Sequence, residues 1–138
     1  MTNPIVDKRI LITGAGRGLG AAYAVIFADL GAELTLAGRK PEALEAIARA
    51  IRERTGKMAE IVALDLADVA QVEETASRWC KARRPLDILV NNGAMWLAGP
   101  MESHGVGEIA RTLTANIAGT LVLTRGLLPV LKQSPAAD

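Results

Sequence analysis

Short apolar runs alternate along the chain with apolar residues at helical spacing. Arg9 to Thr13 is an apolar run that ends in glycines, which is typical of a buried strand. The large apolar residues that follow recur at helical spacing and predict a helix ending at Gly31, a common helix C-cap residue. The pattern repeats and predicts further strands at Ala32–Ala37, Met58–Leu64 and Leu86–Asn91 and helices from Pro41 and from Val69. Strands that alternate with helices predict a parallel sheet with right-handed crossovers.

The last predicted element is a long helix over Ser103–Leu131. It contains only scattered glycines before Pro129, and after Asn116 it is apolar on nearly every side. A helix of this kind is covered on every side. In a doubly wound sheet of order 3-2-1-4, the fourth strand, Leu86–Asn91, would also be an edge with free backbone groups. We therefore expect the isolated chain to dimerise or aggregate through these surfaces.

Composition narrows the class of protein. The 138 residues are 50% hydrophobic and 22% charged, which fits one globular domain over residues 1–138. The 16 basic and 15 acidic residues nearly cancel and aromatic residues are scarce, which argues against nucleic-acid binding. The longest uncharged run, Ile88–Met101, is shorter than the roughly 20 residues of a spanning helix. With no apolar leader and one cysteine, we expect a cytoplasmic domain without a membrane span.

A glycine-rich loop joins the first strand to the first helix. Its sequence is Thr13-Gly14-Ala15-Gly16-Arg17-Gly18-Leu19-Gly20. Glycines at such a junction let backbone N–H groups approach a pyrophosphate, which the N-terminus of the helix then faces. The loop has no lysine for a phosphate-loop NTPase, and Leu19 replaces the third glycine of G-x-G-x-x-G; the pattern it matches is T-G-x-x-x-G-x-G. The alternative is a turn that only connects strand to helix, and the position in the first βα unit favours the binding role.

Three further motifs follow in order. Asp65-Leu66 comes after the third strand, Asn91-Asn92-Gly93-Ala94 closes the fourth, and Asn116 lies in the long helix. Together with the glycine loop, they make the chain from Arg9 to Leu131 resemble the short-chain dehydrogenase/reductase family. The resemblance implies an α/β fold with a Rossmann-type doubly wound parallel sheet in three αβα layers. It also implies hydride transfer between a nicotinamide cofactor and a small-molecule carbonyl or alcohol.

The catalytic half of the family pattern has no counterpart in this sequence. In the family, a fifth strand with a serine and a Tyr-x-x-x-Lys helix follow the long helix. Here the single tyrosine is Tyr23, with Phe27 four residues later. We therefore expect the cofactor half of a reductase, truncated after the fourth strand and long helix, which is inactive alone. A non-catalytic NADP(H)-binding module and a remnant that binds nothing are the alternatives.

The end of the second strand bears on the choice of cofactor. NAD-preferring relatives carry an aspartate where this chain has Gly38, and Arg39 follows directly. An arginine here accommodates a ribose 2′-phosphate, and Arg17 can approach the same group. The sequence therefore favours NADP(H) over NAD(H). The alternative is that Arg39 and Lys40 are solvated charges at a helix start.

The resemblance assigns roles to the remaining motif residues. Asp65 and Leu66 are expected at the adenine ring, although Asp65 could instead cap the next helix with Asp68. Asn91 and Gly93 are expected at the cofactor, with the side chain or the carbonyl of Asn91 near the ribose unless Asn91 is only a turn residue. Asn116 would have a supporting catalytic role through water and a lysine, or would be a satisfied asparagine that bends the helix. The long helix 103–131 commonly packs on its equivalent in a second subunit, which implies a homo-oligomer. No metal site is expected.

Overall fold

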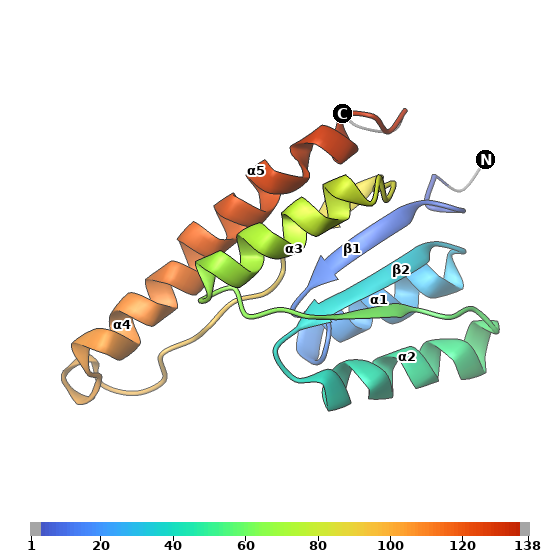
Figure 1. Cartoon of the computed structure of the whole chain (residues 1–138). Helices are drawn as coiled ribbons and strands as arrows, with labels where there is room; N and C mark the ends of the chain where they lie inside the picture. The colour runs from blue at the N-terminus through green and yellow to red at the C-terminus, as the bar shows by residue number, and fades with distance from the viewer. Residues whose placement is uncertain (1–3, 136–138) are drawn as a thin grey trace.

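Four parallel strands form one sheet in the order β3-β2-β1-β4. Figure 1 shows the two middle strands, β1 and β2, side by side. The structure, a computed structural model, describes residues 4–135. The strands are β1 (Arg9–Thr13), β2 (Glu33–Gly38), β3 (Glu60–Ala63) and β4 (Ile88–Val90). β1 is central, since Ile12 is in register with Leu36 of β2 and with Val90 of β4. The predicted α/β fold with a Rossmann-type parallel sheet is confirmed. The third and fourth strands are shorter than predicted, because β3 and β4 end where their pairing with β2 and β1 ends.

Helices cover both faces of the sheet, which gives the three predicted layers. Figure 1 shows α1 (Gly18–Asp29) and α2 (Pro41–Thr55) on one face and α3 (Val69–Lys81) and α5 (Thr120–Leu131) on the other. Successive side chains of a strand point to opposite faces. Accordingly, Ile10 and Ile12 pack with the α1–α2 layer, whereas Leu11 between them packs with the α3–α5 layer.

The first helix has the predicted extent but buries its small residues. Its buried positions are Gly20, Ala24 and Ala28, whereas Leu19 is 66% exposed and Ile26 is 52% exposed. Small side chains let the helix axis lie close to the glycine loop and the sheet. The large apolar residues that predicted the helix therefore lie mainly on its outer face. The helix ends as predicted before Gly31, which has a φ of +93° and donates its N–H to Ala28.

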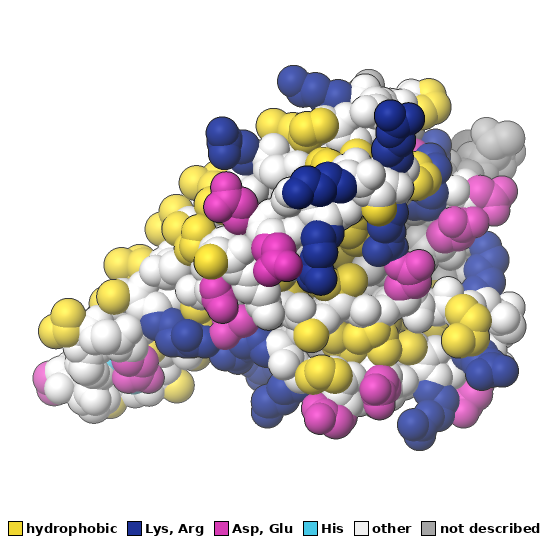
Figure 2. Space-filling model, viewed as in Figure 1, with side chains coloured by type: hydrophobic (Ala, Val, Ile, Leu, Met, Phe, Trp, Pro, Cys, Tyr) yellow, Lys and Arg dark blue, Asp and Glu magenta, His cyan; other side chains and the backbone are white. Residues whose placement is uncertain are grey.

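The long helix begins later than predicted and contains a π-helical turn. Met101–Ser103 forms a 3₁₀ turn, and the helix runs through α4 (Val106–Leu113), a π turn (Thr114–Gly119) and α5. It packs closely on α3, since a Cβ atom on Gly126 would lie 2.6 Å from Ala76 Cβ. Its inner face is buried at Ala115, Gly119, Leu123, Leu127 and Val130. The outer face is exposed at Leu113, Ile117, Leu121 and Leu128, and Figure 2 shows hydrophobic side chains along this helix.

Two surfaces remain uncovered among residues 4–135, namely the free edge of β4 and the outer face of the long helix. β4 pairs with β1 on one side only, so the predicted edge strand is confirmed. The continuous helix Val106–Leu131 has 26 residues and is the one described helix whose length and composition would let it cross a membrane. Leu123 and Leu127 of this helix are fully buried in the cluster that includes Trp79 of α3. One face of the helix is therefore packed in the core, whereas its outer face has no partner among residues 4–135.

Candidate cofactor site

A cavity of about 800 Å³ lies where the strands end at their carboxyl termini. We call it the carboxyl-end cavity. It is lined by residues of all four segments that follow the strands: the glycine loop, Gly38–Lys40, Leu64–Leu66 and Asn92–Met95. In open α/β sheets, ligands bind in the crevice at this end of the strands. The structure thus brings together most of the residues predicted to bind the cofactor.

The glycine loop has backbone geometry that larger residues would strain. Gly14 and Gly18 have φ values of +67° and +55°, in the left-handed region. A Cβ atom on Gly14 would lie 2.7 Å from Gly93 Cα, whereas one on Gly18 would meet nothing within 4 Å. A Cβ atom on Gly20 would overlap the Gly14 carbonyl oxygen. Gly14 and Gly20 therefore permit close backbone packing, and Gly18 leaves the space in front of the α1 N-terminus open.

Thr13 and Asn92 fasten the glycine loop to the end of β4. The Thr13 hydroxyl oxygen accepts hydrogen bonds from the N–H groups of Asn92 at 3.1 Å and Gly93 at 2.9 Å. In return, Asn92 Nδ2 donates to the carbonyl oxygens of Thr13 at 3.0 Å and Gly14 at 3.3 Å. These bonds fix the two loops that border the cavity near Gly93. The sequence motif alone did not indicate this role of Asn92.

The Asn91 side chain is not at the cavity, so of the two groups expected near the ribose, the side chain and the carbonyl, only the carbonyl stays a prediction. The side chain is exposed, does not line the carboxyl-end cavity, and donates from Nδ2 to the Thr124 hydroxyl of α5 at 3.0 Å. Consecutive residues leaving a strand point in opposite directions. Because Asn92 points toward the glycine loop, Asn91 points the other way, toward α5. The two consecutive asparagines of the motif indicated that one of them faces the cavity, but the sequence did not show which one.

The cavity is lined by three cations and one carboxylate. Arg17, Arg39 and Lys40 line it, and none of them takes part in an ion pair among residues 4–135. Asp65 is the only acidic residue among the described lining residues. A cleft lined with a surplus of positive charge favours an anionic ligand. The cations lie on the glycine loop and just beyond β2, as predicted.

The sequence left two roles open for Asp65, contact with the adenine ring and capping of the next helix. The helix cap is Asp68, whose Oδ1 accepts the Gln71 N–H at 3.0 Å. Asp65 lies in the cavity wall, where its Oδ1 accepts the Ala67 N–H at 2.9 Å and its Oδ2 pairs with Arg111 of α4. Asp65 therefore does not cap α3, and it is available to the cavity.

Asn116 is a satisfied asparagine in the π turn of the long helix. Its Oδ1 accepts the Met95 N–H at 2.7 Å, and its Nδ2 donates to the Met95 carbonyl at 2.8 Å. The Asn116 side chain thus satisfies both backbone groups of Met95, as a neighbouring strand would. These two hydrogen bonds hold the loop after β4 against the long helix. The structure thus supports the helix-distorting role predicted as one of two alternatives for Asn116.

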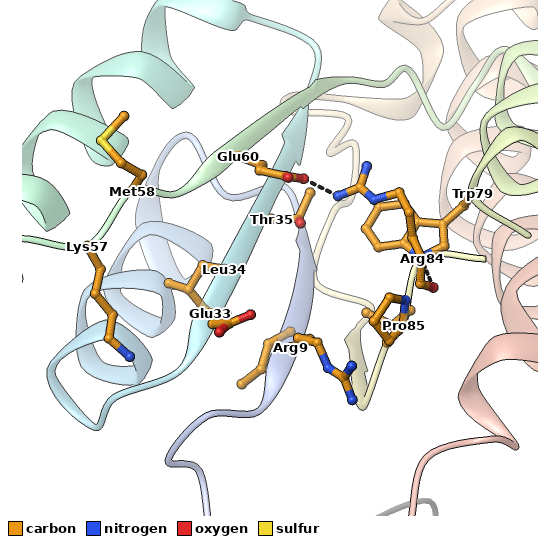
Figure 3. Close-up of a pocket in the computed structure, with 12 residues that line it drawn as sticks. Arg9, Glu33, Leu34, Thr35, Lys57, Met58, Glu60, Trp79, Arg84 and Pro85 are labelled. Carbon is orange, nitrogen blue, oxygen red and sulfur yellow. Dashed lines mark hydrogen bonds and ion pairs between the residues drawn. The ribbon is translucent and has the colours of Figure 1, made fainter. Parts of the chain in front are cut away.

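A second cavity, of about 460 Å³, lies at the opposite, amino-terminal end of β1 and β2 (Figure 3). Its cations already have partners within the chain. Arg9 Nε donates to Asp87 at 2.7 Å, Arg84 pairs with Glu60, and Lys57 donates to a backbone carbonyl. The hydrogen bond with Asp87, and more weakly the charge of Glu33, raise the pKa of Arg9. Because these charges are compensated internally, this second cavity offers an anionic ligand less than the carboxyl-end cavity does.

Comparison with known proteins places the chain in a family. Residues 8–138 match the family model described as short chain dehydrogenase. An uncharacterized oxidoreductase of Mycobacterium tuberculosis is 36% identical over 125 residues, which cover 91% of this chain and 47% of the relative. A protein of Pseudomonas syringae described as a short chain dehydrogenase superposes with a TM-score of 0.82 at 32% identity and covers 98% of this chain and 56% of that one.

A Shigella flexneri protein described as a short chain dehydrogenase, solved in complex with NADP, superposes with a TM-score of 0.84 at 31% identity. That match covers 98% of this chain and 58% of the other. The chain thus spans about half the length of the relatives that it matches. The family-model match covers nearly the whole chain, and the glycine loop, the cavity and the sheet order agree with it. The chain belongs to the short-chain dehydrogenase/reductase family of oxidoreductases.

Proposed function

We propose that this chain provides the NADP(H) site of an oxidoreductase that transfers hydride between NADP(H) and a small-molecule carbonyl or alcohol. The observation that carries the proposal is the carboxyl-end cavity, in which a glycine loop and three cations without ion pairs face the same space. The NADP in the structure of the Shigella flexneri relative supports the choice of cofactor.

Each part of the cavity suits one part of the dinucleotide. The free N–H groups and the positive dipole end at the start of α1 suit the pyrophosphate. The guanidinium groups of Arg39 and Arg17 suit a 2′-phosphate, which they can bind with charge-assisted hydrogen bonds. Gly38 places no carboxylate beside that phosphate, and a Cβ atom there would lie 3.3 Å from Leu44 Cδ2. Leu44 would have to move by only a few tenths of an ångström to admit a side chain there, so the missing carboxylate, and not crowding, favours the 2′-phosphate.

When bound, the nicotinamide ring supplies or accepts the hydride, and the protein contributes position and electrostatics. The chain's own residues bind the phosphates, and the bonds of Thr13, Asn92 and Asn116 fix the loops around the cavity. The ring of Tyr23 stacks on Phe27, and Tyr23 does not line the cavity. We therefore assign the acid–base step to groups other than the described residues and expect no turnover by this chain alone.

We further propose that the chain acts as a homo-oligomer through the outer face of the long helix. Leu113, Ile117, Leu121 and Leu128 are each at least 40% exposed and recur at spacings of four and seven residues. A two-fold axis would pair this stripe with its copy, since the same surface then serves both subunits.

The test of the cofactor assignment is a titration of the chain with NADPH and with NADH. Arg39→Ala removes charge-assisted hydrogen bonds to the 2′-phosphate, so we expect NADPH affinity to fall by about 1.5–3 kcal/mol and NADH affinity to stay nearly unchanged. Arg49→Ala, at an exposed arginine of α2, is the matched control and should alter neither. An equal loss for both cofactors in Arg39→Ala would refute the phosphate role, and an unaltered chain that binds neither would refute the proposed function.

A further inference from the structure

One face of the long helix forms a wall against the segment that follows β3. Arg111, Ala115 and Gly119 are spaced four residues apart along this face. Arg111 pairs with Asp65, and Ala115 lines the carboxyl-end cavity. Gly119 abuts the Leu66 carbonyl so closely that any Cβ atom would overlap it. The position of Asp65 and Leu66 is therefore set by a helix that begins at Val106, far later in the sequence.

The carboxylate of Asp65 is held from two directions. Oδ1 accepts the Ala67 N–H, and Oδ2 pairs with the Arg111 guanidinium. Its backbone is held as well, since the Asp65 N–H donates to Gln71 Oε1 at 2.7 Å. The side chain keeps 26% of its surface exposed and lines the cavity. A carboxylate has about four lone-pair positions, so the two bonds leave acceptor capacity on the cavity side.

Arg111 also changes the charge that a ligand meets. Asp65 is the only carboxylate among the described residues that line the carboxyl-end cavity. A dinucleotide phosphate is a polyanion, and a bare carboxylate beside it would repel it. The Arg111 side chain is 48% exposed, and its guanidinium offsets this charge while leaving the acceptor oxygens in place. The Asp65–Arg111 ion pair therefore presents carboxylate oxygens to a ligand in the cavity as acceptors of fixed direction, with little net charge.

We propose that Arg111 is a positioning residue that sets recognition of the adenine base, because it aims the Asp65 carboxylate at the exocyclic amino group. This inference rests on the proposed binding of NADP(H) in the carboxyl-end cavity. The amino group of adenine is a donor and matches an acceptor-only carboxylate. Hypoxanthine carries a carbonyl oxygen at that position, so two acceptors would face one another. A site that directs an acceptor at this point discriminates between the two bases.

The experiment compares NADPH with reduced nicotinamide hypoxanthine dinucleotide phosphate, which differs only in the base. Dissociation constants are measured by nucleotide fluorescence for the unaltered chain, Arg111→Ala, Arg111→Lys, Asp65→Asn and the control Arg49→Ala. We expect the unaltered chain and the control to prefer NADPH by about 10-fold or more, the fold-change expected from one hydrogen bond to a charged group. Arg111→Ala should bring this ratio close to one, and Arg111→Lys should restore part of it.

Asp65→Asn has nearly the same shape and should lower the ratio, because its amide can donate to the hypoxanthine carbonyl. A ratio in Arg111→Ala equal to that of the unaltered chain, whether or not both affinities fall, would overturn the positioning role. If Arg111→Ala does not fold, an unchanged ratio in both Arg111→Lys and Asp65→Asn would overturn it instead. An unaltered chain that binds both nucleotides equally overturns this inference alone, whereas one that binds neither overturns the proposed function.

Discussion

Two glycines of the long helix should respond with opposite signs to the same substitution. Gly119 is buried and abuts the Leu66 carbonyl, whereas Gly107 is exposed and a Cβ atom there would meet nothing within 4 Å. Both have helical backbone conformations, so alanine removes a backbone-entropy penalty of at most about 1 kcal/mol at either position. The difference between the two variants therefore measures the contact with Leu66.

The magnitude follows from what surrounds each position. Overpacking costs about 1–3 kcal/mol when side chains can adjust. Gly119 faces a backbone carbonyl, which cannot rotate away, so we take the upper end of about 3 kcal/mol. This cost exceeds the gain in helix propensity, and Gly119→Ala should destabilise the chain by about 2 kcal/mol. Gly107→Ala has no such cost and lies in the first turn, so we expect it to be stabilising by about 0.5 kcal/mol.

Urea unfolding followed by far-ultraviolet circular dichroism measures both changes. A shift of the midpoint without a change in slope identifies an effect on stability. Because Leu66 lines the carboxyl-end cavity, NADPH affinity should also fall in Gly119→Ala and remain unchanged in Gly107→Ala. If Gly119→Ala is as stable as Gly107→Ala, the long helix does not press on the segment after β3, and the reasoning fails.

Three other predictions follow from the same structure. Gly14→Val should abolish nucleotide binding in a titration, because Gly14 has a φ of +67° and a Cβ atom would lie 2.7 Å from Gly93 Cα. If the variant binds at the original strength, the loop only connects β1 to α1. Asp87→Asn should lower the free energy of unfolding at pH 7 by about 2 kcal/mol, since Asp87 accepts bonds from the Arg9 side chain and N–H. The hydrogen bond from Arg9 holds the pKa of Asp87 well below its ordinary value, so this difference should be full above the ordinary pKa and shrink as the pH falls below about 4; a difference that grows in acid would contradict it. In sedimentation, the chain should form dimers or larger assemblies that Leu121→Glu weakens, and a stable monomer with slow amide exchange through β4 would argue against the proposed interface.

The order of the elements and the chemistry of the first loop could be predicted from the sequence alone. Apolar periodicity is a local property of strands and helices, and it located β1 to the residue and the start of α2 at Pro41. The glycine loop was also recognisable, because positive φ at Gly14 and Gly18 is a backbone demand that glycine meets at those positions. Short-range rules of this kind need no knowledge of the partners across the fold.

The tertiary structure decided which side chains face the cavity. Thr13 and Asn92 are 79 residues apart, so the sequence could not show that Asn92 fastens the loops while Asn91 points toward α5. It likewise could not show that Arg111 pairs with Asp65. Side-chain direction at a strand end and the meeting of a helix with a distant loop depend on how the layers pack. The sequence thus predicts where the proposed cofactor site lies, and the packing of the long helix determines how the walls of that cavity are held.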